Sequence, residues 1–116
     1  MKILEYPRPV GDTGIGFHWF PDIYHSYENQ FDVLIPRLKA LGASWLTILS
    51  EPDKPLPEFF IRGLIEHGIE PVIRVYTPVV RLLDQAALRQ ICQTYAQWGA
   101  HYIHVYNEPN LKGEWE

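Results

Sequence analysis

The chain has 116 residues, a formal net charge of −4 and 47% hydrophobic residues. This length suits one globular domain with a core, and the acidic balance argues against a nucleic-acid partner. No apolar run approaches the roughly 18 residues of a membrane span. The amino terminus has no signal-peptide pattern, so no membrane partner is expected and the compartment is cytoplasmic by default. The single cysteine, Cys92, lies on an apolar helical stripe, which favours a buried side chain over a reactive thiol.

Strand-like and helical patterns alternate along the chain. Strands are expected at residues 15–20, 45–49, 71–76 and 102–106. Helices are expected at 27–41, at 57–67, and from the residue after Asp84 to about 99. Pro36 predicts a kink or a new start within the first helix, and Gly42, Gly68 and Gly99 are typical of helix ends.

The second and third strand runs are almost continuously apolar. Such runs are typical of parallel strands that are covered on both faces. Strands that alternate with helices through short connections form right-handed βαβ units. Two architectures fit this pattern, an open doubly wound sheet and a (β/α)8 barrel. Neither glycine-rich nucleotide-binding signature is present in the sequence.

The tripeptide Asn107-Glu108-Pro109 directly follows the fourth strand run. In barrel enzymes the catalytic groups lie at the carboxyl ends of the strands. The stretch from His101 to Asn110 resembles the fourth strand of the retaining (β/α)8 glycoside hydrolases of clan A. Residues 14–19, 38–49 and 68–76 are similar to earlier strands and helices of that fold, so the resemblance covers nearly the whole chain.

The resemblance implies an α/β chain of TIM-barrel type, in which residues 1–116 are one partial domain with strands 1 to 4. It implies that Glu108 is the general acid/base of O-glycosyl hydrolysis and that Asn107 binds the 2-hydroxyl of the sugar. Retaining hydrolysis needs a second carboxylate as nucleophile. The clan carries it on strand seven, which these four strands do not include, so the isolated chain is expected to be inactive.

The resemblance therefore implies a carbohydrate substrate, with no cofactor and no metal. It also implies that the partner of these four strands is a carboxyl-terminal half-barrel or a second copy of the chain. The alternative is a non-catalytic half-barrel module that binds carbohydrate or assembles with a partner.

Further candidates for substrate binding lie on the strand runs. Arg74 is charged within an apolar run, so it is expected to point away from the helices, where it meets either a carboxylate of the protein or the substrate. Tyr76 shares its parity. His18 and Trp19 end the first run at the level of Glu108, and both are candidates for substrate binding, Trp19 by stacking on the face of a sugar; the register decides which of them faces the substrate side. His104 shares parity with Tyr106 and, if the strand stays regular, with Glu108.

Overall fold

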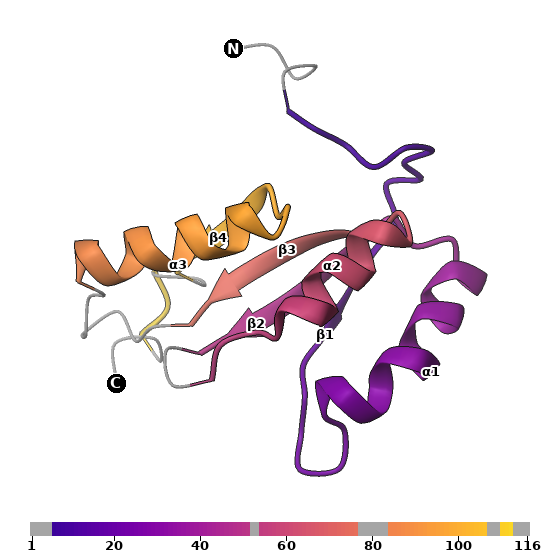
Figure 1. Ribbon diagram of the computed structural model, residues 1–116, viewed down its shortest axis with the longest axis horizontal. Helices are drawn as coiled ribbons and strands as arrows, with labels where there is room; N and C mark the ends of the chain where they lie inside the picture. Colours follow the sequence, from indigo (N-terminus) through magenta and orange to yellow (C-terminus); the bar gives the residue numbers. More distant parts are fainter. Residues whose placement is uncertain (1–5, 52–53, 77–83, 107–109, 113–116) are drawn as a thin grey trace.

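The computed structural model describes residues 6–51, 54–76, 84–106 and 110–112. Within them the chain forms a mixed α/β fold with a four-stranded parallel sheet in the order β1-β2-β3-β4 (Figure 1). The strands are β1 (Gly16–Trp19), β2 (Trp45–Ser50), β3 (Glu70–Val75) and β4 (Tyr102–Val105). All four expected strands are therefore present, each within two residues of its predicted bounds.

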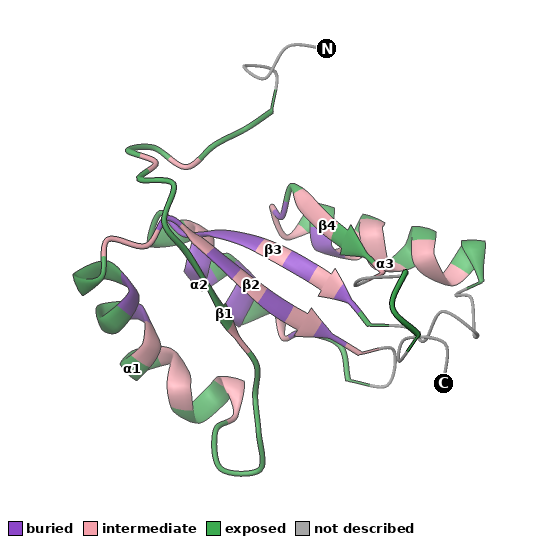
Figure 2. Ribbon diagram, turned by 180° about the vertical axis from the view of Figure 1, so that it is seen from behind, coloured by how far each residue is buried: buried purple, intermediate pink, exposed green. Residues whose placement is uncertain are grey.

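The strand register assigns each residue to one face of the sheet. Burial alternates along β2 and β3, and the buried members, such as Leu46, Ile48 and Ile73, face the helices. The three helices lie on this one face (Figures 1 and 2). We call the opposite face the open face; the register places on it His18, Thr47, Leu49, Val72, Arg74, Tyr102 and His104.

Helix α1 (Tyr27–Ala40) begins at a capping box. The Ser26 hydroxyl accepts a hydrogen bond from the Asn29 backbone N–H, and the Asn29 side chain accepts one from the Ser26 N–H. The helix continues through Pro36, so the new start that this proline predicted does not occur. It ends at Leu41, and Gly42 follows with a φ of 70°, the left-handed conformation that glycine adopts without steric cost.

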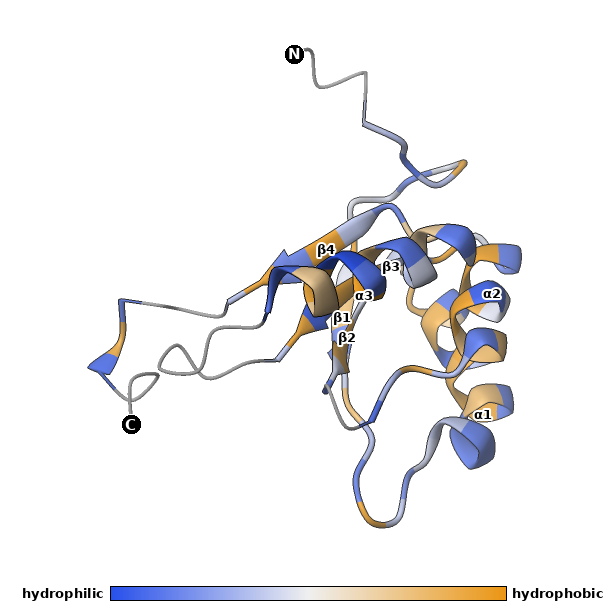
Figure 3. Cartoon of the chain, turned by 60° about the vertical axis from the view of Figure 1, so that its left-hand side comes forward, coloured by the Kyte–Doolittle hydropathy of each residue, from blue (hydrophilic) through white to orange (hydrophobic). Residues whose placement is uncertain are grey.

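The other two helices are α2 (Glu58–Glu66) and α3 (Gln85–Gln97), and neither has the capping box of α1. Pro57 is the N-cap of α2 rather than its first helical residue, and Asp84 is the N-cap of α3 without a capping bond from its side chain. The apolar sides of α1 and α2 face inward, and their hydrophilic sides face outward (Figure 3). Hydrophobic burial along these stripes holds the helices on the sheet.

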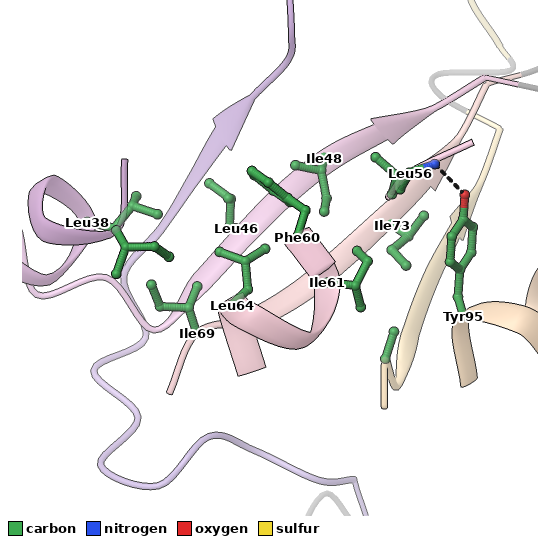
Figure 4. Packing of buried hydrophobic residues seen from close by; sticks show 12 residues of the cluster. Leu38, Leu46, Ile48, Leu56, Phe60, Ile61, Leu64, Ile69, Ile73 and Tyr95 are labelled. Carbon is green, nitrogen blue, oxygen red and sulfur yellow. Dashed lines mark hydrogen bonds between the residues drawn. The ribbon is translucent and has the colours of Figure 1, made fainter. Parts of the chain in front are cut away.

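The core lies between the helices and the sheet, and Phe60 is at its centre (Figure 4). This ring is fully buried and stacks on Trp19 with ring centroids 5.5 Å apart. Tyr27 and Phe31 meet the same ring edge to face at 4.8 and 5.7 Å. Full burial of one such ring stabilises the fold by up to about 3 kcal/mol, so this aromatic cluster fixes α1, α2 and β1 together.

The sheet differs from a doubly wound sheet in two respects. A doubly wound sheet carries helices on both faces and reverses its strand order at a switch point. In the described part of the chain the strand order does not reverse, and the helices cover one face only. The outer edges of β1 and β4 have no neighbouring strand in the described residues, and both Phe17 and Val105 are 37% exposed there.

Candidate functional site

The loops that follow β1 and β2 line an open pocket, called the cavity below, at the carboxyl edge of the sheet. Its volume is about 350 Å³, and its walls combine apolar, carboxylate and ammonium groups. The lining residues are Pro21, Asp22, Ile23, Tyr27, Leu49, Glu51 and Lys54. Glu51 and Lys54, both in the loop between β2 and α2, form an exposed ion pair at 3.5 Å. The cavity therefore lies at the sheet edge where strand-end side chains gather.

The loop between β1 and α1 is held by Asp22. Its carboxylate accepts hydrogen bonds from the backbone N–H groups of Tyr24 and His25 at 2.7 Å, and the His25 ring Nδ1 lies 2.8 Å away. The hydrogen bond to the His25 ring, together with the backbone donors, holds the pKa of Asp22 below its ordinary value. Asp22 thus stays ionised as a structural brace for one wall of the cavity.

Two tyrosines connect this edge to the helices. The Tyr27 hydroxyl donates to the Leu49 carbonyl at 3.2 Å, and burial raises its pKa well above the ordinary value, so it stays a neutral donor. The Tyr95 hydroxyl lies 2.6 Å from the Ser50 Oγ and accepts a hydrogen bond from the Leu56 backbone N–H at 3.0 Å (Figure 4). Both contacts join a helix to the end of β2, so they fix the position of the cavity wall.

Arg74 and His104 are neighbours on the open face. They are register partners in β3 and β4, and both point away from the helices, as expected from their parity. Arg74 is partly buried, whereas His104 is exposed. The carboxylate partner expected for Arg74 within the sheet is not found among the described residues. His18 lies on the same face at the β1 edge, with its ring 6.1 Å from Phe20.

Trp19 lies on the opposite face from His18. Its ring contacts Phe60 and Tyr27 inside the helix-facing core, with centroids 5.5 and 5.4 Å away. Of the two residues that end the first strand, the structure therefore brings only His18 to the face that carries Arg74. The sequence left this choice open because both residues are aromatic and the side of the sheet is set by packing.

The ends of β3 and β4 carry two more predicted binding residues. Tyr76 is 42% exposed directly after β3, and its backbone N–H donates to the Ser50 carbonyl. β4 ends at Val105, and Tyr106 has a φ of 60°, a left-handed conformation that costs a residue with a Cβ roughly 1–2 kcal/mol. Because regular strand geometry stops there, the parity argument from His104 no longer reaches residue 108.

Asn107 and Glu108, the residues predicted to carry the chemistry, lie outside the described residues, as does Pro109. The described part of the site is therefore the framework around that tripeptide: the strand ends, the open face and the cavity between the first two loops.

Residues 7–14 contact the amino end of the open face, which the sequence did not predict, and an open pocket of about 520 Å³ lies between them and Trp45. The Tyr102 hydroxyl donates to the Pro7 carbonyl at 2.6 Å, and the Trp45 ring N–H donates to Asp12 at 2.7 Å. The Trp45 and Tyr102 rings meet edge to face at 5.4 Å. Asp12 also accepts from the Gly14 N–H, which with Trp45 lowers its pKa. The Tyr102–Pro7 and Trp45–Asp12 contacts join segments far apart in sequence, so no local motif indicates them.

Glu70 is the one buried acid of the described residues, and it too lies at the amino end. Its carboxylate is 2.9 Å from the His101 ring Nδ1 and accepts from the His101 backbone N–H at 3.3 Å. It is therefore satisfied within the protein and far along the strands from the carboxyl edge. Hydrophobic periodicity gave no signal for it because Glu70 precedes the apolar run of β3.

Among the residues described, no three acidic, histidine or cysteine side chains lie close enough together to hold a metal ion. None of the helices described there is long and apolar enough to cross a membrane. Comparison with known proteins finds no matching family model, no matching curated protein and no matching solved structure.

Proposed function

We propose that this chain is the first half of a (β/α)8 barrel of a retaining glycoside hydrolase, in which Glu108 is the general acid/base. The observation that carries the proposal is the place of Asn107-Glu108-Pro109 in the chain. The tripeptide begins two residues after Val105, where β4 ends at the same sheet edge as the other strands. A carboxyl group after strand four of an unreversed parallel sheet is where a barrel enzyme carries catalytic groups.

Three features of the described residues support the proposal. The strands follow one another in sequence order, the helices cover one face, and the open face carries polar side chains such as Arg74 and His104. A closed barrel places this open face in its interior and the helices outside. The cavity beside Glu51 lies at the carboxyl edge, where a sugar would bind.

The proposed chemistry gives each residue a role. Glu108 protonates the glycosidic oxygen as the bond to the leaving group breaks, and later removes a proton from the attacking water. Asn107 donates to the 2-hydroxyl of the sugar. The nucleophile is a second carboxylate about 5–5.5 Å from Glu108, and it comes from a segment beyond these four strands.

The test is leaving-group dependence in the protein at its natural full length. Glu108→Gln is expected to lower kcat/KM by about 100-fold or more on aryl glycosides with poor leaving groups. With activated leaving groups the loss is smaller, because departure then needs little acid assistance. Glu66→Gln, an exposed position on α2, is the matched control and leaves both rates unchanged. Equal losses on both kinds of substrate would remove Glu108 from the acid role.

A second function, a non-catalytic module that assembles with a partner, is supported by one observation. Both edge strands are unpaired in the described sheet, and each exposes an apolar residue on its helix side, Phe17 and Val105. Unpaired edges favour pairing with another chain. Turnover of glycosides by the natural protein, abolished by Glu108→Gln, would exclude this reading.

A further inference from the structure

We propose that Arg74 and His104 form a binding site for the carboxylate or phosphate group of an anionic carbohydrate. This inference rests on the proposed function and deepens it, because it names the charge of the ligand that the open face accepts. The two residues are register partners on adjacent parallel strands, which lie about 4.8 Å apart. Both side chains leave the same face, and at this spacing one small oxyanion can contact both.

The frame around the pair is fixed. Tyr102, two residues before His104 on the same face, is held by its hydroxyl bond to Pro7 and by the Trp45 ring. Arg74 lies in β3, which has a strand on each side in the described sheet. A guanidinium on a rigid strand presents two parallel donors to a carboxylate or phosphate with little loss of entropy.

Arg74 has no anionic partner in the described part of the chain. Arg74 is partly buried and forms no ion pair with a described residue. Partial burial of an unpaired guanidinium costs free energy that an incoming anion would recover, whereas an exposed cation that is unpaired among the described residues, such as Arg89, is solvated by water.

Two carboxylates, one at the start of β3 and one directly after β2, are already engaged. Glu70 is held by His101 at the amino end, and Glu51 is paired with Lys54 at the carboxyl edge. A region with Arg74 and His104 and no free carboxylate of the described residues is locally positive within a protein of net charge −4. Such local sign reversal attracts anions to the open face and repels them elsewhere.

The test measures binding to the protein at its natural full length by isothermal titration at low ionic strength. The ligands are glucose, glucuronate, glucose 6-phosphate and inorganic phosphate. We expect one anionic sugar to bind at least about tenfold more tightly than glucose, since a charge-assisted hydrogen bond is the added contact. Whichever of glucuronate and glucose 6-phosphate binds more tightly identifies the anion as carboxylate or phosphate.

Variants then assign the contact. Arg74→Gln is expected to lower the affinity for the anionic sugar by about tenfold or more, and Arg74→Lys by less, because lysine keeps the charge without the planar fork. Arg89→Gln removes the same charge from an exposed position on α3 and leaves binding within about twofold. Dispersed NMR spectra of each variant establish that it is folded.

Four outcomes decide the proposal. If glucose binds as tightly as its anionic relatives, the anion site is wrong and the carbohydrate site stands. If inorganic phosphate binds as tightly as the sugar phosphate, the anion site stands and its link to carbohydrate is wrong. If no ligand binds, or if Arg74→Gln binds unchanged, the proposal is overturned. If the anionic sugar binds only to the Glu108→Gln variant, the Glu108 carboxylate of the chain itself pairs with Arg74, and the proposal is also overturned.

Discussion

Replacement of Tyr95 by phenylalanine tests whether the end of β2 depends on a single hydroxyl group. Tyr95 is 2% exposed, and its hydroxyl serves two partners, the Ser50 Oγ at 2.6 Å and the Leu56 backbone N–H at 3.0 Å. Ser50 and Leu56 are also buried, so water does not replace the lost contacts. A buried donor left without an acceptor costs about 1–3 kcal/mol. The Ser50 hydroxyl has freedom to rotate, so the Leu56 N–H dominates and the expected loss is about 2 kcal/mol.

The assay is urea unfolding, with thermal unfolding beside it. For a domain of this size the loss corresponds to a fall in Tm of roughly 8 °C. Tyr27→Phe is the matched control: its hydroxyl donates to one carbonyl from a half-buried site, and it should cost no more than about 1 kcal/mol. A double-mutant cycle with Ser50→Ala isolates the Ser50–Tyr95 contact. A loss below about 0.5 kcal/mol for Tyr95→Phe would refute the reasoning, and a strong Ser50–Tyr95 coupling in the cycle would show that Ser50, not Leu56, dominates.

Three further predictions concern the amino end, the helix layer and the sheet edges. The pKa of Asp12 is lowered, so its contribution to the free energy of unfolding is present above the ordinary pKa of 3.8 and is lost as pH falls through the folded-state pKa. Asp12→Asn should therefore lower stability at pH 7, and urea titrations at successively lower pH should show the difference between the two proteins disappear. Gly63→Ala places a methyl group against the Phe31 ring and should cost about 1–3 kcal/mol, partly recovered by Phe31→Leu; an unchanged unfolding midpoint would contradict this. The unpaired edges of β1 and β4 predict that the chain self-associates at micromolar concentration, whereas a monomer mass in sedimentation equilibrium, with unfolding independent of concentration, would exclude it.

The elements were predictable from the sequence because their signals are local. Continuous apolar runs identified β2 and β3, and glycines with positive φ after each helix, such as Gly68, marked the helix ends. Of the two outcomes predicted for Pro36, the new start does not occur, because a proline on the exposed side of α1 loses one hydrogen bond without losing the packing of Ile35 and Leu38 on the core. Tertiary burial outweighed the local penalty.

The site was predictable only in part, because the alternation of side chains along a strand does not by itself decide which face is buried or where the strand ends. Parity correctly placed Arg74 and His104 on one face, but it did not decide between His18 and Trp19, where contact with Phe60 settles the orientation. The parity of Glu108 was predicted only for a regular strand, and the left-handed conformation of Tyr106 ends the regular strand after Val105. The catalytic assignment of the motif stays a prediction, as it rests on residues outside those described.

The two ends of the open face are chemically different, and this difference bears on where a ligand can enter. At the amino end, Asp12 and Pro7 engage the polar groups of Trp45 and Tyr102, and an open pocket of about 520 Å³ lies beside Trp45. At the carboxyl edge the loops leave a cavity of about 350 Å³ beside Leu49 and Glu51. In the proposed function, a sugar would enter from the carboxyl edge, pass the strand ends and then reach Arg74 and His104 on the open face. The proposed anion contact at one end of that sugar would set its direction, with the opposite end left at the carboxyl edge of the sheet.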